Sequence, residues 1–305
     1  MNKFTWRNSI KKYWQLYLLL IPVIAYFIIF KYIPMVGVQI AFKDFSNVKG
    51  IWGSDWIGLE NFMRFFRSPV FTDIISNTVI LSLFTLIFTF PAPIILALIV
   101  NELRVKLAKK ALQNITYAPH FLSTIVVVGM MGALLSPSIG IINTMLIKAG
   151  IIDKGIYFMN LPQWFRPMYI ISDLWKNMGW NAIIFISALS SIDVTLYEAA
   201  RVDGASKWQQ MKKITVPLLV PTIMIMLILT CGNIMSIGFE KVFLMQTDLN
   251  LSVSEVISTY VYKTGLVNNQ YSYATAIDLF NSVINFSILI IVNKLSKKYS
   301  DNSLW

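Results

Sequence analysis

The run from Ile214 to Phe239 contains no Asp, Glu, Lys or Arg. An α-helix needs roughly 20 predominantly apolar residues to cross about 30 Å of hydrocarbon, so this run is long enough to span a membrane. Val79–Val100 and Tyr117–Leu135 are also free of formal charge. Since 56% of the residues are hydrophobic, only 13% are charged and the mean hydropathy is +0.63, the chain is predicted to be an integral membrane protein.

Three further spans are predicted at Leu16–Phe30, Tyr169–Ile192 and Tyr273–Asn293. The first is short and is expected to extend past Lys31 if that side chain snorkels to the interface. The fold class that follows is all-α, a polytopic membrane protein with six transmembrane helices and one domain covering residues 1–305. Pro91 and Pro93 lie in the middle of the second span and are expected to kink it.

Basic residues concentrate in both terminal segments and in two alternate loops, so nearly all of the net charge of +11 falls on one side of the predicted membrane. Positively charged loops stay in the cytoplasm. We therefore predict a multi-pass protein of the cell membrane with both chain ends cytoplasmic. Topology and anionic membrane lipid account for the basic charge, and no nucleic-acid partner is expected.

Catalytic machinery is not expected on this chain. There is no Gly-Lys dipeptide, so a Walker phosphate loop is absent from the sequence. With one histidine and one cysteine, no metal site, catalytic residue or bound cofactor is predicted. His120 is interpreted as a histidine that forms hydrogen bonds within the helix bundle, with a proton relay as the alternative.

A charged loop at residues 193–216 lies between two predicted spans. Leu196–Ala200 and Ser206–Lys213 are predicted to be helical, and Asp203-Gly204 separates them at a point where glycine can adopt positive φ. Two short helices joined in this way form a compact knob. Such a knob can insert into a cleft on a partner protein, whereas the alternative is an ordinary solvated loop.

A motif occurs from Glu198 to Pro217, with the pattern of Glu-Ala-Ala, three residues, Gly, nine residues, Ile, one residue, a hydrophobe and Pro. It resembles the motif of the permease subunits of ATP-binding-cassette importers, in which Leu is usual at the position of Val216. Pro221, Trp56–Phe62, Asn77-Thr78, Phe30–Met35 and Ala41–Phe45 extend the similarity to the carbohydrate-uptake branch and to its group associated with complex oligosaccharides.

The resemblance implies a type I permease fold that supplies half of a sugar or oligosaccharide pathway. It implies three protein partners: a second permease subunit, commonly a different protein, a cytoplasmic ATPase dimer that carries ATP and Mg²⁺, and an extracellular solute-binding protein. The knob would then be the coupling helix that docks on the ATPase, and the residues implied in docking are Glu198, Ala199, Ala200, Arg201, Asp203, Gly204 and Ala205.

Polar residues at helical spacing mark candidate substrate contacts in the last three spans. Polar groups are unfavourable in lipid, so these faces should turn inward, where amide, carboxylate and aromatic groups suit a sugar. The alternative is that they only connect helices through hydrogen bonds. The candidates are Asp173, Asn177, Trp180 and Asn181 on the fourth helix, Asn233 and Ser236 (with Thr230) on the fifth, and Asp278, Asn281 and Asn285 on the sixth.

Two other functions remain open from the sequence. One is an importer of the same type for a peptide, an amino acid or an anion. The other is a proton-coupled secondary transporter that uses Asp278 or His120. Six spans without an inverted repeat are atypical of such carriers, and nothing in them requires the Glu198–Gly204 motif.

Overall fold

The computed structural model describes residues 6–103 and 105–300. The predicted cytoplasmic location of the two chain ends concerns segments outside these residues. The chain folds as two compact units: one comprises residues 1–67 and 261–279, and the other comprises residues 68–260 and 280–305. Each unit is described by itself.

The first unit contains a long apolar helical stretch followed by a small polar cap. Within the described residues, the helical stretch Lys12–Phe42 is long enough to cross a membrane, so the first span continues past Lys31 as expected. Strands β1 and β2 then pair antiparallel, with Lys43 opposite Trp56. The elements are α1 (Trp6–Phe27), η1 (Ile28–Tyr32), α2 (Ile33–Met35), η2 (Val36–Phe42), β1 (Lys43–Asp44), α3 (Gly50–Gly53), β2 (Asp55–Trp56) and α4 (Glu60–Phe66).

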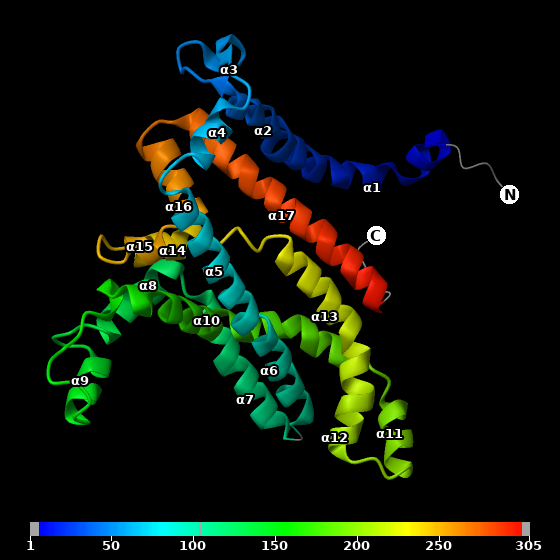
Figure 1. Cartoon of the computed structure of the whole chain (residues 1–305). Coiled ribbons are helices and arrows are strands. Elements are labelled where there is room, and N and C mark those ends of the chain that lie inside the picture. Colours follow the sequence, from blue (N-terminus) through cyan, green and yellow to red (C-terminus); the bar gives the residue numbers. More distant parts are fainter. Residues whose placement is uncertain (1–5, 104, 301–305) are drawn as a thin grey trace. The chain divides into compact units, whose positions relative to one another are not determined.

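The second unit holds most of the helices (Figure 1). In chain order they are α5 (Phe71–Thr89), α6 (Pro91–Glu102), α7 (Lys106–Tyr117), η3 (Ala118–Phe121), α8 (Thr124–Leu134), α9 (Ile141–Lys148), η4 (Phe158–Asn160), α10 (Pro162–Ser190), α11 (Val194–Val202), α12 (Lys207–Gln210), η5 (Met211–Thr215), α13 (Val216–Cys231), α14 (Phe239–Met245) and α15 (Leu251–Ser254). The remaining elements of the described residues are α16 (Ile257–Tyr262), η6 (Lys263–Val267) and α17 (Tyr271–Ser300).

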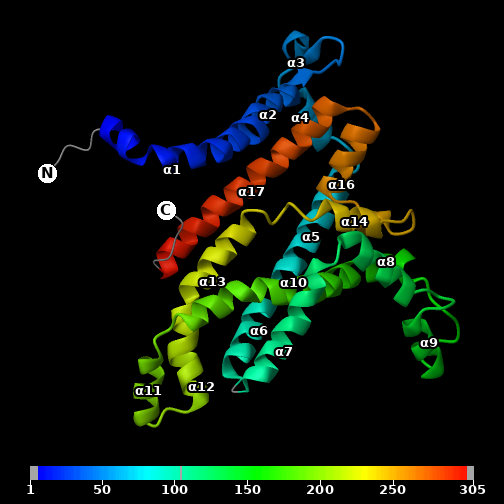
Figure 2. The same ribbon diagram turned by 180° about the vertical axis from the view of Figure 1, so that it is seen from behind.

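Helix α10 is the central element of the second unit. It packs against α5, α6, α7 and α13, and both views show α6 and α7 along one side of it (Figures 1 and 2). Gly179 allows this close packing, because a Cβ atom there would overlap the carbonyl group of Thr116 on α7. Buried side chains on either side of this crossing form two apolar clusters, one around Phe165 and Tyr169 and the other around Ala182 and Phe185.

The count of membrane spans agrees with the expectation. Among the described residues, four helices are long and apolar enough to cross a membrane, and two bent pairs raise the number to six. The second span runs from Phe71 to Glu102, and its two assigned helices, α5 and α6, meet at Phe90, directly before Pro91.

Two predicted spans differ from the observed helices. The third, Tyr117–Leu135, is not one helix: α7 to η3 and α8 meet at 99°, because Pro119 lies in a tight turn and Ser123 caps a new helix through the N–H of Val126. The fifth, Ile214–Phe239, was predicted too long. Helix α13 ends at Cys231, and residues 232–238 are not α-helical.

Candidate functional site

The knob at residues 193–216 is built from two capped helices. The Asp193 carboxylate accepts a hydrogen bond of 2.9 Å from the N–H of Thr195 at the start of α11, and this bond holds the pKa of Asp193 below its usual range. At the other end, Ala205 N–H donates to Ala200 and Gly204 N–H donates to Arg201. This is a Schellman ending. Gly204 takes φ of +75°, which confirms the expected positive φ.

The second half of the knob is fastened to the helices around it. Ser206 and Gln209 form a capping box at the start of α12. The hydroxyls of Tyr197 and Thr215 lie 3.0 Å apart and join α11 to the base of α13. Lys207 forms an ion pair of 3.3 Å with Glu102 at the end of α6. The knob is therefore a shaped element with fixed ends rather than an open loop.

The outer surface of the knob is unpaired and partly apolar. Glu198 is exposed, and within residues 6–103 and 105–300 it forms no hydrogen bond or ion pair. Val202 is 88% exposed and Trp208 is 68% exposed. Arg201 donates a hydrogen bond to the carbonyl of Tyr197, one turn earlier on the same helix. The surface combines a free carboxylate with apolar side chains, which suits contact with another protein.

The seven residues predicted to dock lie at this surface. Their exposure varies along the loop. The exposed residues are Glu198, Ala199, Arg201, Asp203 and Gly204, and the half-buried ones are Ala200 and Ala205.

A chain of polar contacts runs along α10. Asp173 accepts a hydrogen bond of 3.1 Å from the amide of Asn177. The Asn177 oxygen lies 3.1 Å from Nδ1 of His120, and the His120 ring stacks on Trp180 with 4.4 Å between centroids and 5° between planes. The structure therefore brings together three of the four predicted residues of α10. Asn181, the fourth, is exposed.

His120 connects two elements that are distant in the sequence. Its contacts are a hydrogen bond to Asn177 and the stack on Trp180. These contacts match the interpretation of a histidine bonded within the helix bundle. They also fix the orientation of the Trp180 ring, one face of which His120 covers.

Lys241 on α14 completes this polar chain and was not predicted. Its ammonium lies 3.4 Å from the Asp173 carboxylate, donates to the carbonyl of Tyr169 at 2.8 Å and sits 4.2 Å from the centre of the Tyr169 ring. Burial lowers the pKa of Lys241 to about 8, and the Asp173 charge opposes that shift. The sequence around Lys241 contains no pattern that would have indicated its pairing with Asp173 on another helix.

Asn233 and Ser236 are not on the fifth helix, contrary to the prediction, because both follow its end at Cys231. They line a cavity of about 370 Å³ together with Ser82, Thr85 and Thr89 of α5. Within the part of the chain that the structure describes, the hydroxyls of Ser82 and Thr85 are buried there without a hydrogen-bond partner. Ser82, Thr85 and Thr89 follow one another at i, i+3 and i+7 in the second span, and this helical spacing is the signal that could have identified the three hydroxyls in the sequence.

The three predicted residues of α17 have different environments. Asn281 and Asn285 are buried, and Asp278 is exposed. The Asn285 oxygen accepts a hydrogen bond of 2.9 Å from the N–H of Met235, and its amide donates to Ser236 at 2.9 Å. Asn285 therefore holds the segment after α13 in place. The Asn281 oxygen is buried without a partner in the described part of the chain.

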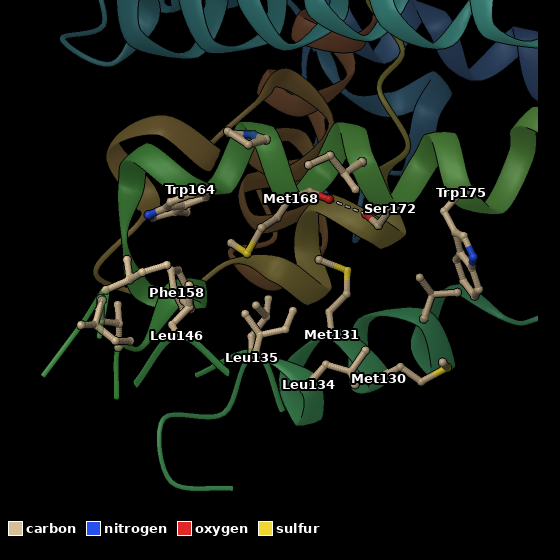
Figure 3. Close-up of a pocket in the computed structure, with 17 residues that line it drawn as sticks. Met130, Met131, Leu134, Leu135, Leu146, Phe158, Trp164, Met168, Ser172 and Trp175 are labelled. Atoms are coloured by element: carbon tan, nitrogen blue, oxygen red, sulfur yellow. Dashed lines mark hydrogen bonds between the residues drawn. The ribbon is translucent and has the colours of Figure 1, made fainter. Parts of the chain in front are cut away.

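One cavity of the second unit is apolar. It has a volume of about 790 Å³ and lies among α8, α9 and α10, with Met131, Leu135 and Met168 on its walls (Figure 3). Ser172 contributes the one hydroxyl among its lining residues, and this hydroxyl already donates to the carbonyl of Met168. Because a sugar needs several hydrogen-bond partners, this cavity is unsuited to a carbohydrate.

Comparisons with known proteins agree with this architecture. "Protein LplB" of Bacillus subtilis (strain 168) is 41% identical over 99% of this chain and 94% of its own length. The "Polygalacturonan/rhamnogalacturonan transport system permease protein YteP" of the same organism is 40% identical, covering 95% of this chain and 90% of its own.

A solved structure of a bacterial ABC transporter involved in the import of the acidic polysaccharide alginate contains a chain with a TM-score of 0.88. It is 42% identical and covers 96% of this chain and 98% of that one. The family described as "Binding-protein-dependent transport system inner membrane component" matches residues 75–301. This chain therefore belongs to the inner-membrane components of binding-protein-dependent transport systems.

Proposed function

We propose that this chain is a permease subunit of an ATP-binding-cassette importer and forms half of the translocation pathway for an oligosaccharide. The observation that carries the proposal is the knob at residues 193–216, which presents the free Glu198 carboxylate and exposed apolar side chains on a capped framework. A docking element of this kind transmits motion from a separate ATPase, so this chain needs no catalytic residues of its own.

The partners follow from that role. We propose a second permease subunit, different from this chain, a cytoplasmic ATPase dimer that binds ATP and Mg²⁺, and an extracellular solute-binding protein. In support, another solved alginate transporter, with a TM-score of 0.89 and 40% identity, is described in complex with an alginate pentasaccharide-bound periplasmic protein and covers 97% of this chain and 99% of that one. The knob and both chain ends would face the cytoplasm, as the charge distribution favours.

Carbohydrate is the cargo that the comparisons and the polar residues favour. YteP and the alginate transporters are named for polysaccharides, and Trp180 with Asn177 offers the aromatic ring and amide that sugars use. We propose a path lined by Asp173, Asn177, Trp180, Asn181, Asn233, Ser236 and Asn281, with Asn285 as a positioning residue. A substrate contact by Asp278, which belongs to the first unit, is proposed separately.

The docking role is tested by replacing Glu198 in the assembled transporter. Glu198→Ala removes the carboxylate and should reduce both sugar uptake and ATP hydrolysis stimulated by loaded binding protein at least tenfold, because charge-assisted bonds at a buried contact are strong. Glu198→Gln keeps the shape of the side chain but not its charge, so its uptake and stimulated ATP hydrolysis should lie between those of the wild type and Glu198→Ala. Wild-type stimulation in Glu198→Ala would contradict the docking role.

A matched pair of glycines separates docking from backbone strain. Gly204 and Gly150 both have positive φ, of +75° and +69°, and both have open space where a Cβ would lie. Valine should strain the backbone at either position. Only Gly204→Val should also uncouple transport, since it places a branched side chain on the docking surface. Equal uptake by the two variants at equal expression would show that Gly204 serves the fold alone.

A further inference from the structure

Lys176 is a charged residue within α10, one of the helices of a candidate membrane-spanning pair. A lysine at such a position is unfavourable unless it is paired or serves a function. The ammonium donates to the hydroxyl of Thr124 at 3.3 Å. Among residues 6–103 and 105–300, no carboxylate lies within ion-pair distance of it.

A carboxylate on the same helix as Lys176 already has other partners. Asp173, one turn earlier on α10, pairs with Lys241 at 3.4 Å and accepts the amide hydrogen bond from Asn177. Lys176 and Lys241 line the same cavity of about 170 Å³, together with Thr124 and the exposed Glu240. The formal charges of the cavity cancel, but Lys176 is the cation without a carboxylate partner.

An aromatic surface lies one turn beyond Lys176. Trp180 is 42% exposed, and His120 covers one face of its ring. Phe121, which is 75% exposed, meets the Trp180 ring edge-on with centroids 5.7 Å apart. Residues four apart on a helix share one face, so a cation and an aromatic surface occur side by side. A uronic-acid ring offers the complementary pair of groups, a carboxylate and an apolar C–H face.

We propose that Lys176 binds the carboxylate of a uronic-acid unit of the transported oligosaccharide, with the Trp180 and Phe121 rings against the sugar face. The inference rests on the proposed function and adds to it the substrate class, an acidic oligosaccharide. An ammonium has three N–H donors, so the bond to Thr124 leaves two for the ligand. Glu240 repels the same carboxylate and limits how tightly it is held.

The test uses the purified complete transporter and two ligands that differ in one group. The probes are radiolabelled 1→4-linked trigalacturonate and galactotriose of the same linkage, in which CH₂OH replaces each carboxylate. The wild-type complex should bind trigalacturonate at least roughly tenfold more tightly than galactotriose, as expected for a charge-assisted bond. Lys176→Met should abolish most of that preference, Lys176→Arg should retain it, and Glu240→Gln should increase it.

Lys148→Met, at an exposed lysine at the end of α9, is the matched control and should leave the preference unchanged. Thermal melting of each complex verifies folding. The inference is overturned if Lys176→Met keeps the preference, or if the wild type binds both sugars equally or binds neither. Uptake of neutral oligosaccharide in those cases would leave the proposed permease function standing, whereas absence of any oligosaccharide uptake would remove that function as well.

Discussion

Gly179 shows how a single residue determines the position of the candidate path. A Cβ at this position would meet the carbonyl and the side chain of Thr116 on α7, so the two helices can approach closely only with glycine here. The next residue is Trp180, which stacks on His120 at the end of the same helical segment. The close crossing therefore brings the aromatic ring and the histidine into contact.

Replacement of Gly179 by alanine should destabilise the fold. The obstructing atoms belong mainly to the backbone of α7 and cannot rotate away, so we expect a loss of about 1–3 kcal/mol from overpacking and a lower melting temperature of the purified transporter. Gly129→Ala on α8 is the control, because no atom lies within 4 Å of the added Cβ. Equal melting of the two variants would show that α7 can shift without cost.

For single residues, the sequence predicted local backbone conformation better than the partners of side chains. The positive φ of Gly204 followed from its place between two helical segments. The pairing of Asp173 with Lys241 did not, because 68 residues separate them and periodicity is a local signal. Likewise, Asn285 was placed on an inward face without any indication that its partner would be the backbone of Met235.

Among the elements, α13 shows why a helix end is difficult to predict from hydropathy. Residues 232–238 contain no charged side chain, like the helix before them. Hydropathy therefore could not distinguish this segment from α13. Two features end the helix: Gly232 and Gly238 border the segment, and Asn285 supplies side-chain bonds to Met235 N–H and Ser236. Irregular backbone within an apolar region persists where such partners satisfy it.

Asn285→Leu should loosen this segment. It removes the acceptor of the buried Met235 N–H, and an unsatisfied buried donor costs about 1–3 kcal/mol. Hydrogen exchange followed by mass spectrometry should show faster exchange in peptides covering residues 232–238. Ser287→Ala on the same helix is the control, because its exposed hydroxyl donates to the carbonyl of Val283, one turn earlier on that helix. Unchanged exchange in the leucine variant would mean that the segment is held by other contacts.

For the whole molecule, composition and hydropathy were sufficient to predict the fold class. The prediction of an all-α membrane protein is confirmed, and six spans are reached when each bent pair counts as one. Hydropathy could not give the 99° bend between η3 and α8, because apolar composition records burial or lipid contact and not the direction of the chain. The turn at Pro119 and the cap at Ser123 determine that direction.

The sidedness of the chain can be tested by single cysteines. The charge distribution predicts that the loop at Val105 lies in the cytoplasm and that the cap of the first unit lies outside. Val48 is 97% exposed and Val105 is 63% exposed, so a cysteine at either position is accessible within this chain.

In a Cys231→Ser background, which removes the buried native thiol, Val48→Cys should react with a membrane-impermeant maleimide in intact cells. Val105→Cys should react only after the cells are permeabilised, because the reagent cannot cross the bilayer. Labelling of Val105→Cys from outside, with Val48→Cys protected, would invert the topology. It would also place the knob at residues 193–216 on the side that lacks ATP, so the proposed docking on a cytoplasmic ATPase depends on this result.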